Sequence, residues 1–136
     1  MYIAFCGPIM ANHTADGMSV PVVDIDDNGT FKYVLIKIVK AGSTNKENTM
    51  YLVRGHKWAD YHDDLVEECK TQLRNSSPEM KVQCVGGGRI QHDRDQKIIN
   101  VYGYSVGYGQ AKHADTCKVL KTYYSDYTVE WSNEGY

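Results

Sequence analysis

The ten residues TFKYVLIKIV at positions 30–39 form a dense run of β-branched, aromatic and aliphatic side chains. Such side chains fit the pleated, partly buried surface of a sheet, so the run predicts a central strand. The turn signal DDNG at 26–29 separates it from a shorter strand that we predict over 20–24. A third strand is predicted over 49–54, after a loop of small and polar residues at 41–47.

The second half of the chain alternates between helical and strand patterns. Apolar residues spaced by three and four predict a helix over 57–74. We expect it to end before Pro78, because proline is not tolerated inside a helix. Two strands over 81–91 and 97–105, joined by the polar turn HDRD, predict a hairpin. The remaining elements are a helix and a strand, predicted over 110–123 and 127–131.

The order of these elements, βββαββαβ, implies a mixed β-sheet of about six strands flanked by two helices, an α/β (α+β) fold. A chain of 136 residues is expected to form one domain, which we place at residues 19–136. We expect residues 1–18 to be a disordered tail. Their apolar start lacks a basic region and is too short to span a bilayer, so we expect no membrane partner.

Charge and cysteine content limit the classes of function. With 15 basic and 17 acidic residues the net charge is -2, so no global basic field favours nucleic acid, and any anion site has to be local. No exposed apolar stripe is evident, and we expect a monomer. The cysteines form no C-x-x-C pair, which suits a reducing cytosol and predicts a cytoplasmic location. They are Cys6, Cys69, Cys84 and Cys117.

His62 lies on the apolar stripe of the first predicted helix, where a titratable side chain is unusual. A buried neutral imidazole needs only one donor and one acceptor, so it is either a satisfied core residue or a working group. The other members of the stripe are Trp58, Leu65, Val66, Cys69 and Leu73.

Lys32 interrupts the apolar face of the central strand. Side chains alternate along a strand, so Lys32 shares a face with Val34, Ile36 and Ile38, which favour burial. Its ammonium either extends past the sheet edge into solvent or is directed at a bound anion, where it acts as a point charge.

Three glycines, Gly86, Gly87 and Gly88, lie inside a predicted strand, where they cost backbone entropy and supply no packing. A bulge or a helix pressed against the sheet is one explanation. Room for a ligand is the other, with Arg89 offering a planar fork of donors to a phosphate.

The segment YGYSVGYG at 102–109 joins the hairpin to the second predicted helix. Its glycines allow successive backbone N–H groups to turn toward one point, and Ser105 adds a hydroxyl donor. The positive end of the helix that we predict from 110 would support the same anion. A flexible connection whose tyrosines simply pack is the alternative.

Several catalytic motifs are absent from the sequence. No Gly-Lys-Ser/Thr follows the glycine run, and Gly103, Gly107 and Gly109 do not form the dinucleotide fingerprint. No H-E-x-x-H spacing is present, and His56 and His62 are six residues apart, on different faces of a helix. The sequence therefore predicts neither a nucleotide triphosphatase nor a metal hydrolase.

Taken together, these motifs resemble the phosphohistidine phosphatases, a family that includes the Janus proteins of insects. The resemblance covers roughly residues 20–136, and its co-linear motifs are far more specific than any one of them. The segments that carry it include VDID at 23–26, FKYVLI at 31–36, VRG at 53–55, KWA at 57–59, YH at 61–62, GGGRI at 86–90, VYGYS at 101–105, YG at 108–109 and NEGY at 133–136.

The resemblance implies a metal-independent protein phosphatase that needs no cofactor and acts on phosphohistidine-containing proteins. Its catalytic histidine corresponds to His62, as general base or as nucleophile, and we expect this ring to act when neutral. The phosphate contacts correspond to Lys32, Ser105, Val106 and Gly107, with Arg89 as a further contact.

Arg54 and His113 also occupy family motif positions, where support for the ends of helices explains them equally well. A non-catalytic module that recognises phosphoproteins through the same loop is the alternative function. It would need the cation and the amides, but it would have no use for an in-line base such as His62.

Overall fold

The computed structural model describes residues 20–40, 49–76 and 78–135. The predicted tail at 1–18 and the predicted loop at 41–47 lie outside these ranges. The described elements occur in the predicted order. They are β1 (Val23–Ile25), β2 (Gly29–Lys40), β3 (Thr49–Gly55), α1 (His62–Ser76), β4 (Met80–Asp93), β5 (Ile98–Tyr102), α2 (His113–Tyr123) and β6 (Thr128–Trp131).

The six strands form one mixed sheet in the order β1-β3-β2-β4-β5-β6. The long strands β2 and β4 pair antiparallel in its middle, and β4 forms an antiparallel pair with β5, which confirms the predicted hairpin. The two outer pairs, β1 with β3 and β5 with β6, are parallel. The predicted mixed sheet is therefore confirmed, with the run at 30–39 as a central strand.

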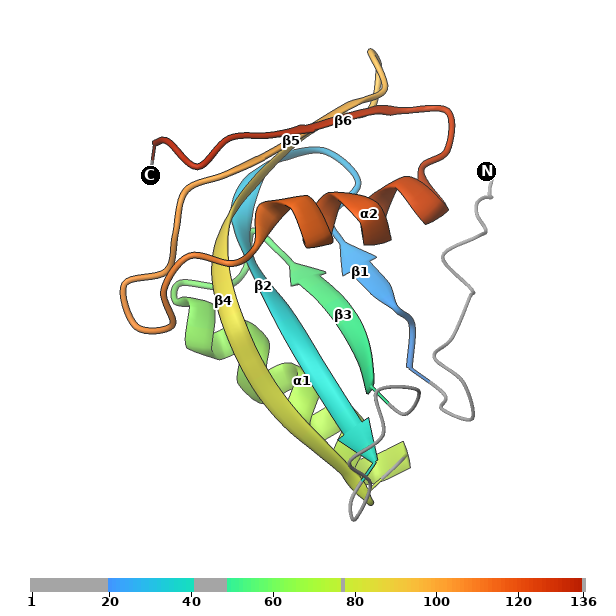
Figure 1. Ribbon diagram of the computed structural model, residues 1–136, viewed down its shortest axis with the longest axis vertical. Helices are drawn as coiled ribbons and strands as arrows, with labels where there is room; N and C mark the ends of the chain where they lie inside the picture. Colours follow the sequence, from blue (N-terminus) through green and yellow to red (C-terminus); the bar gives the residue numbers. More distant parts are fainter. Residues whose placement is uncertain (1–19, 41–48, 77, 136) are drawn as a thin grey trace.

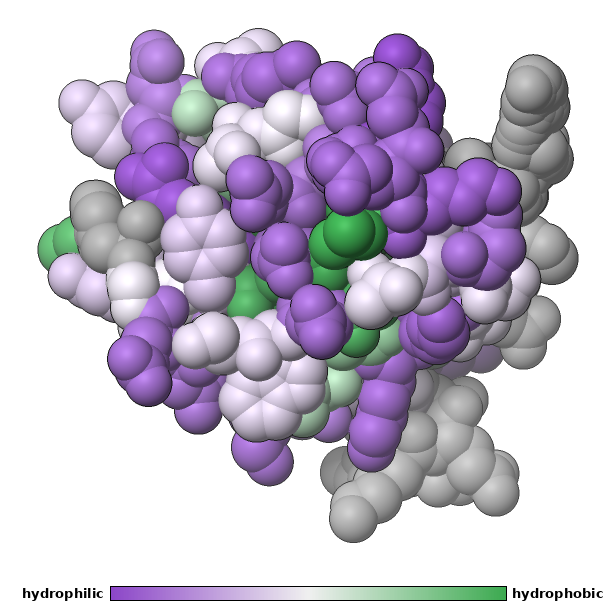
Figure 2. All heavy atoms as spheres, turned by 90° about the horizontal axis from the view of Figure 1, so that it is seen from above, coloured by the Kyte–Doolittle hydropathy of each residue, from purple (hydrophilic) through white to green (hydrophobic). Residues whose placement is uncertain are grey.

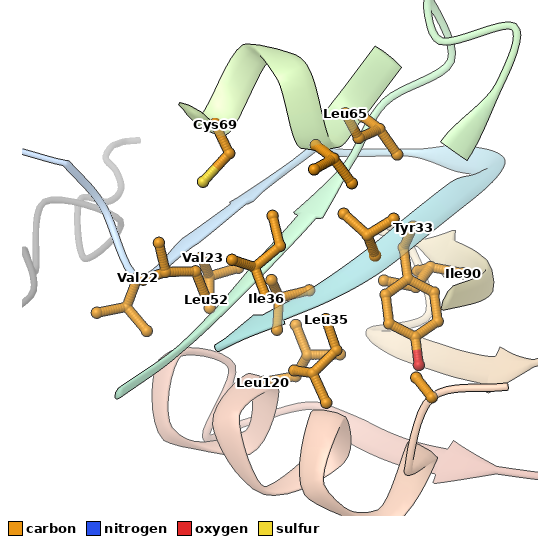
Figure 3. Close-up of a cluster of buried hydrophobic side chains, with 14 of the residues drawn as sticks. Val22, Val23, Tyr33, Leu35, Ile36, Leu52, Leu65, Cys69, Ile90 and Leu120 are labelled. Atoms are coloured by element: carbon orange, nitrogen blue, oxygen red, sulfur yellow. The ribbon is translucent and has the colours of Figure 1, made fainter. Parts of the chain in front are cut away.

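The two helices cover opposite faces of the sheet (Figure 1). Figure 3 shows Leu65 and Cys69 of α1 packed on one face and Leu120 of α2 on the other, with β2 between them. All three side chains are buried, as are Leu35 and Ile36 of β2. Burial of apolar side chains on both faces explains why β2 reads as a nearly continuous apolar run.

Helix α1 begins at His62, so the predicted start at residue 57 is wrong. Asp26, in the turn after β1, accepts a hydrogen bond from the Lys57 N–H at 2.7 Å and pairs with His56 at 2.8 Å. These contacts hold residues 56 and 57 in a non-helical conformation. Trp58 stacks on His56 and stays 54% exposed instead of joining the buried stripe. The other predicted members of that stripe are buried, and they are Leu65, Val66, Cys69 and Leu73.

The three glycines of β4 lie at a bulge and at close backbone contacts. The pairing of β2 with β4 shifts register between Val34 and Ile36, because Val34 pairs with Gly87 whereas Ile36 pairs with Cys84. A Cβ on Gly86 would lie 2.6 Å from the backbone of Ala111, and one on Gly88 would lie 2.3 Å from the Tyr102 carbonyl oxygen. The bulge and close packing explain the run, and no part of it lines the pocket described below.

No helix in the described ranges is long and apolar enough to cross a membrane. Seen from above, the molecule presents mainly hydrophilic side chains with small hydrophobic areas between them (Figure 2).

Gly88→Ala should lower the free energy of unfolding by about 1–3 kcal/mol, the usual cost of forcing extra volume into a packed site. The reason is the contact of only 2.3 Å between the new methyl group and the Tyr102 carbonyl. Gly107→Ala is the matched control, since its Cβ would meet nothing within 4 Å. Urea unfolding of both variants measures the difference, and equal stabilities would contradict this account of the glycine run.

Candidate functional site

A cavity lies where the N-terminus of α1, the first half of β2 and the segment between β5 and α2 meet. It has a volume of about 630 Å³ and is lined by Lys32, residues 60–64 and residues 105–108. Figure 1 shows the β5–α2 segment beside the first turn of α1. Three segments distant in sequence thus form one pocket, which holds Lys32 and His62 together.

His62 is the first residue of α1 and is half-buried in the pocket wall. Its Nε2 lies 3.0 Å from the carbonyl oxygen of Gly88 on β4. A carbonyl oxygen only accepts hydrogen bonds, so Nε2 carries the hydrogen and the lone pair of the neutral ring resides on Nδ1. A Cβ on Gly87 would lie 2.8 Å from the Cδ2 of His62, so the absence of that side chain allows the ring to approach the strand.

The surroundings of His62 favour its neutral form. Burial lowers the pKa of the ring most strongly, and the positive charges of Lys32 and Arg89 lower it further. The hydrogen bond to Gly88 acts in the opposite direction without reversing the shift. The ring therefore titrates below its ordinary value of 6.5 and is largely neutral near pH 7.

Lys32 and Arg89 are cross-strand partners on β2 and β4, and both are half-buried. Lys32 lines the pocket, whereas Arg89 is not among the residues that line it. The structure thus brings five of the six predicted site residues to one cavity. Arg89 contributes its charge to the site through its effect on the His62 ring.

The loop 105–109 is closed by its own hydrogen bonds. The Ser105 N–H donates to the Gly109 carbonyl at 3.1 Å, and the Gly109 N–H donates to the Ser105 carbonyl at 2.8 Å. The Tyr108 N–H donates to the Ser105 Oγ at 3.2 Å. Within the described residues, no such internal bond occupies the N–H groups of Val106 and Gly107, and the Ser105 hydroxyl keeps its proton to donate.

A hydrogen-bond network holds the segment that leads into this loop. The Gly103 carbonyl accepts from the His113 Nε2 at 2.8 Å and from the Gln110 Nε2 at 3.1 Å. Because Nε2 of His113 is a donor, its Nδ1 accepts, and the Tyr33 hydroxyl donates to it at 2.6 Å. His113 is the first residue of α2, which covers the face of the sheet opposite to α1. From that face it holds the chain at Gly103, just before the loop.

The predicted contribution of the second helix to the anion site is wrong. Helix α2 begins at His113 and not at residue 110, because Gln110 and Ala111 continue as an extended segment beside Gly87. The helix whose positive N-terminal end borders the pocket is α1, which starts at His62.

Arg54 is almost fully buried and supports a different part of the fold from the one predicted. Its guanidinium donates to the carbonyl oxygens of Pro21, Val22 and Val53, the first at 2.7 Å. It therefore joins β3 to the chain entering β1 and does not support a helix end.

Two aspartates of the pocket wall are held by protein donors. Asp64 accepts a hydrogen bond from the Tyr61 N–H at 2.9 Å, which caps the first turn of α1. Asp63 accepts a hydrogen bond from the Tyr108 hydroxyl, and this bond is the largest of the causes that raise the pKa of Tyr108 to about 12. The bond between Tyr108 and Asp63 joins the loop to α1 across the pocket.

The sequence predicts neither this bond nor the hydrogen bond from His62 to the Gly88 carbonyl. In the sequence, Tyr108 is only part of the motif YG at 108–109. The two are 45 residues apart, and no local pattern indicates that they meet. In the described residues, no group of three or more His, Cys, Asp or Glu side chains is arranged to hold a metal ion.

Lys32, Ser105, Val106 and Gly107 line the same pocket as the His62 ring, and the groups they carry, a cation, a hydroxyl and two backbone N–H groups, are of the kind that bind tetrahedral anions in proteins. Residues 17–128 match the Janus/Ocnus family, and the chain belongs to that family. The resemblance stated from the sequence motifs is therefore confirmed.

Named relatives are similar over most of their length. The chain is 42% identical to the 14 kDa phosphohistidine phosphatases of Sus scrofa and Homo sapiens over 124 residues, which is 90% of this chain and 97% and 98% of theirs. It is 39% identical to the sex-regulated protein janus-A of Drosophila pseudoobscura pseudoobscura over 122 residues, 89% of this chain and 80% of that protein.

Tyr108→Phe should weaken the binding of inorganic phosphate by several-fold, because the loop loses its bond to α1 and its N–H groups become less ordered. Asp63→Ala should have the same effect, whereas Asp63→Asn, which retains an acceptor oxygen, should retain most of the affinity. Phosphate titration followed by NMR of the loop amides measures this. Equal affinities in the native chain, Tyr108→Phe and Asp63→Ala would show that the bond does not order the loop.

Proposed function

We propose that this protein is a metal-independent phosphatase that hydrolyses the P–N bond of phosphohistidine in other proteins, with His62 as its catalytic residue. The names of relatives that are 42% identical support the substrate class. The observation that carries the assignment of His62 is the hydrogen bond from its Nε2 to the Gly88 carbonyl. That bond directs the reactive lone pair to Nδ1 of a ring kept neutral by burial and by nearby cations.

In this proposal the phosphoryl oxygens are bound by four donors. Lys32 supplies a positive charge, the Ser105 hydroxyl supplies a hydrogen bond, and Val106 and Gly107 supply backbone N–H groups. Donors placed before the reaction stabilise charge on a transferring phosphoryl group without reorganisation during it. Arg89 contributes positive charge from the neighbouring strand.

The chemistry requires little beyond positioning. Once its imidazole is protonated, the substrate histidine is a good leaving group, so the P–N bond breaks as a neutral imidazole departs. Two routes use Nδ1 of His62. Either it removes a proton from the water that attacks phosphorus, or it attacks phosphorus itself, and water then hydrolyses the phosphorylated His62.

We further propose that the protein acts as a cytoplasmic monomer. Cys69, Cys84 and Cys117 are free thiols, and two of them are buried in the core, as expected in a reducing compartment.

Phosphate release from a phosphohistidine peptide should continue in excess EDTA, vanish in His62→Ala and show a raised KM in Lys32→Ala. His62→Ala removes the proposed base or nucleophile, so turnover is lost. Lys32→Ala removes the cation proposed to bind the phosphate, so the KM rises. Lys37→Ala is the matched control, since Lys37 lies on the same strand but not in the pocket, and its KM should be unchanged.

Two results would contradict this proposal. Loss of turnover in EDTA, restored by added metal, would overturn the metal-independent reaction. Absence of turnover in the native chain, with phosphopeptide binding intact, would favour a recognition module in place of an enzyme.

The pH dependence should follow the lowered pKa of His62. Because the neutral ring is the active form, kcat/KM should fall as the pH decreases below this pKa, and the acid limb should lie below 6.5. Lys32→Ala removes a charge that lowers this pKa, so the His62 ring should titrate at higher pH in that variant. NMR titration of the ring in both chains measures the shift, and an equal or higher pKa in the native chain would refute the argument.

A further inference from the structure

The wall of the pocket contains apolar side chains that the proposed hydrolysis does not use. In the described ranges, seven large hydrophobic side chains are exposed, and three of them line this pocket: Tyr61, Val106 and Tyr108. Tyr61 is 71% exposed and Val106 is 81% exposed, and they belong to the two segments that flank the proposed phosphate site. Exposed apolar side chains that gather at one place mark a binding surface more often than those scattered singly.

The size of the pocket also exceeds what the proposed reaction requires. Its volume of about 630 Å³ falls in the range of roughly 300–1,000 Å³ that is typical of sites for drug-sized molecules. A phosphorylated imidazole ring is smaller than such molecules. Space beside Tyr61 and Val106 therefore remains for the residues that flank the phosphohistidine in the chain of the substrate.

The charge of the pocket wall is the second independent observation. Among the described residues that line the pocket, Lys32 is the only cation, whereas Asp60, Asp63 and Asp64 are acidic. Asp63 and Asp64 are bonded to protein donors, but Asp60 is exposed beside Tyr61. The wall beyond the proposed phosphate site thus attracts cationic side chains and repels acidic ones.

From these observations, and on the basis of the function proposed above, we infer that the pocket docks an extended segment of the substrate protein. Tyr61 and Val106 contact an apolar residue next to the phosphohistidine, and Asp60 attracts a lysine or arginine close to it. The preferred substrates are therefore phosphohistidines flanked by apolar and cationic residues, and acidic flanking sequences are disfavoured.

Three phosphohistidine peptides of equal length test this inference: one flanked by Leu and Lys, one by Gly alone and one by Glu. We expect kcat/KM for the first to exceed that for the Gly peptide by roughly tenfold, the factor that about 1.4 kcal/mol of differential binding gives. The Glu peptide should be the poorest substrate. The difference between the Lys and Glu peptides should shrink at high salt, because exposed charges are screened.

Two variants assign the preference to its residues. Tyr61→Ala should reduce the advantage of the Leu-containing peptide, and Asp60→Asn should reduce the discrimination between Lys and Glu, while both retain turnover of the Gly peptide. Trp131→Ala is the matched control, because this exposed aromatic residue on β6 does not line the pocket and should change neither preference.

Equal kcat/KM values for the three peptides in the native chain would overturn this inference and leave the proposed function standing. A preference that persists unchanged in both Tyr61→Ala and Asp60→Asn would also overturn it. Absence of turnover with all three peptides would overturn the proposed function, and this inference with it.

Discussion

The hydrogen bond between His62 Nε2 and the Gly88 carbonyl is the contact on which the geometry of the site depends. It forms because α1 begins at His62 and because Gly87 has no side chain to keep the ring from β4. The bond joins helix to strand, and it also fixes the tautomer by leaving Nδ1 as the basic nitrogen. Removing any of these features would move the ring or change which nitrogen is basic.

Two acidic side chains of the pocket wall are bonded to neutral protein donors. Asp63 and Asp64 line the same pocket as Lys32, and their carboxylates accept hydrogen bonds from the Tyr108 hydroxyl and from the Tyr61 N–H. These bonds order the loop and the first turn of α1. The aspartates therefore contribute to the structure of the pocket, and Lys32 is the cation among its described lining residues.

The sequence predicted the sheet better than the site. The run at 30–39 and the β4–β5 hairpin have strong local patterns, and both were predicted correctly. The starts of the two helices were predicted too early. Asp26 holds residues 56 and 57 outside α1, and Gln110 lies beside the glycine bulge instead of in α2. Both contacts are long-range, so no local pattern indicates them. The bond between Tyr108 and Asp63 was unpredictable for the same reason. Lys32 and His62 stand out in the sequence because each departs from the pattern of its own element, and the structure places both in one pocket.

Lys32 has two effects in the proposed reaction, one before the phosphoryl group binds and one after. In the free protein, burial lowers the pKa of His62 most strongly and the charge of Lys32 lowers it further, which favours the neutral ring that either route requires. When a phosphoryl group binds at Lys32, its negative charge offsets that of the ammonium at the ring. The basicity of Nδ1 then rises while the substrate is in place, because a nearby anion favours the protonated form of an imidazole. A ring that is neutral before binding and more basic after it suits a group that has to accept a proton or a phosphoryl group only when substrate is bound.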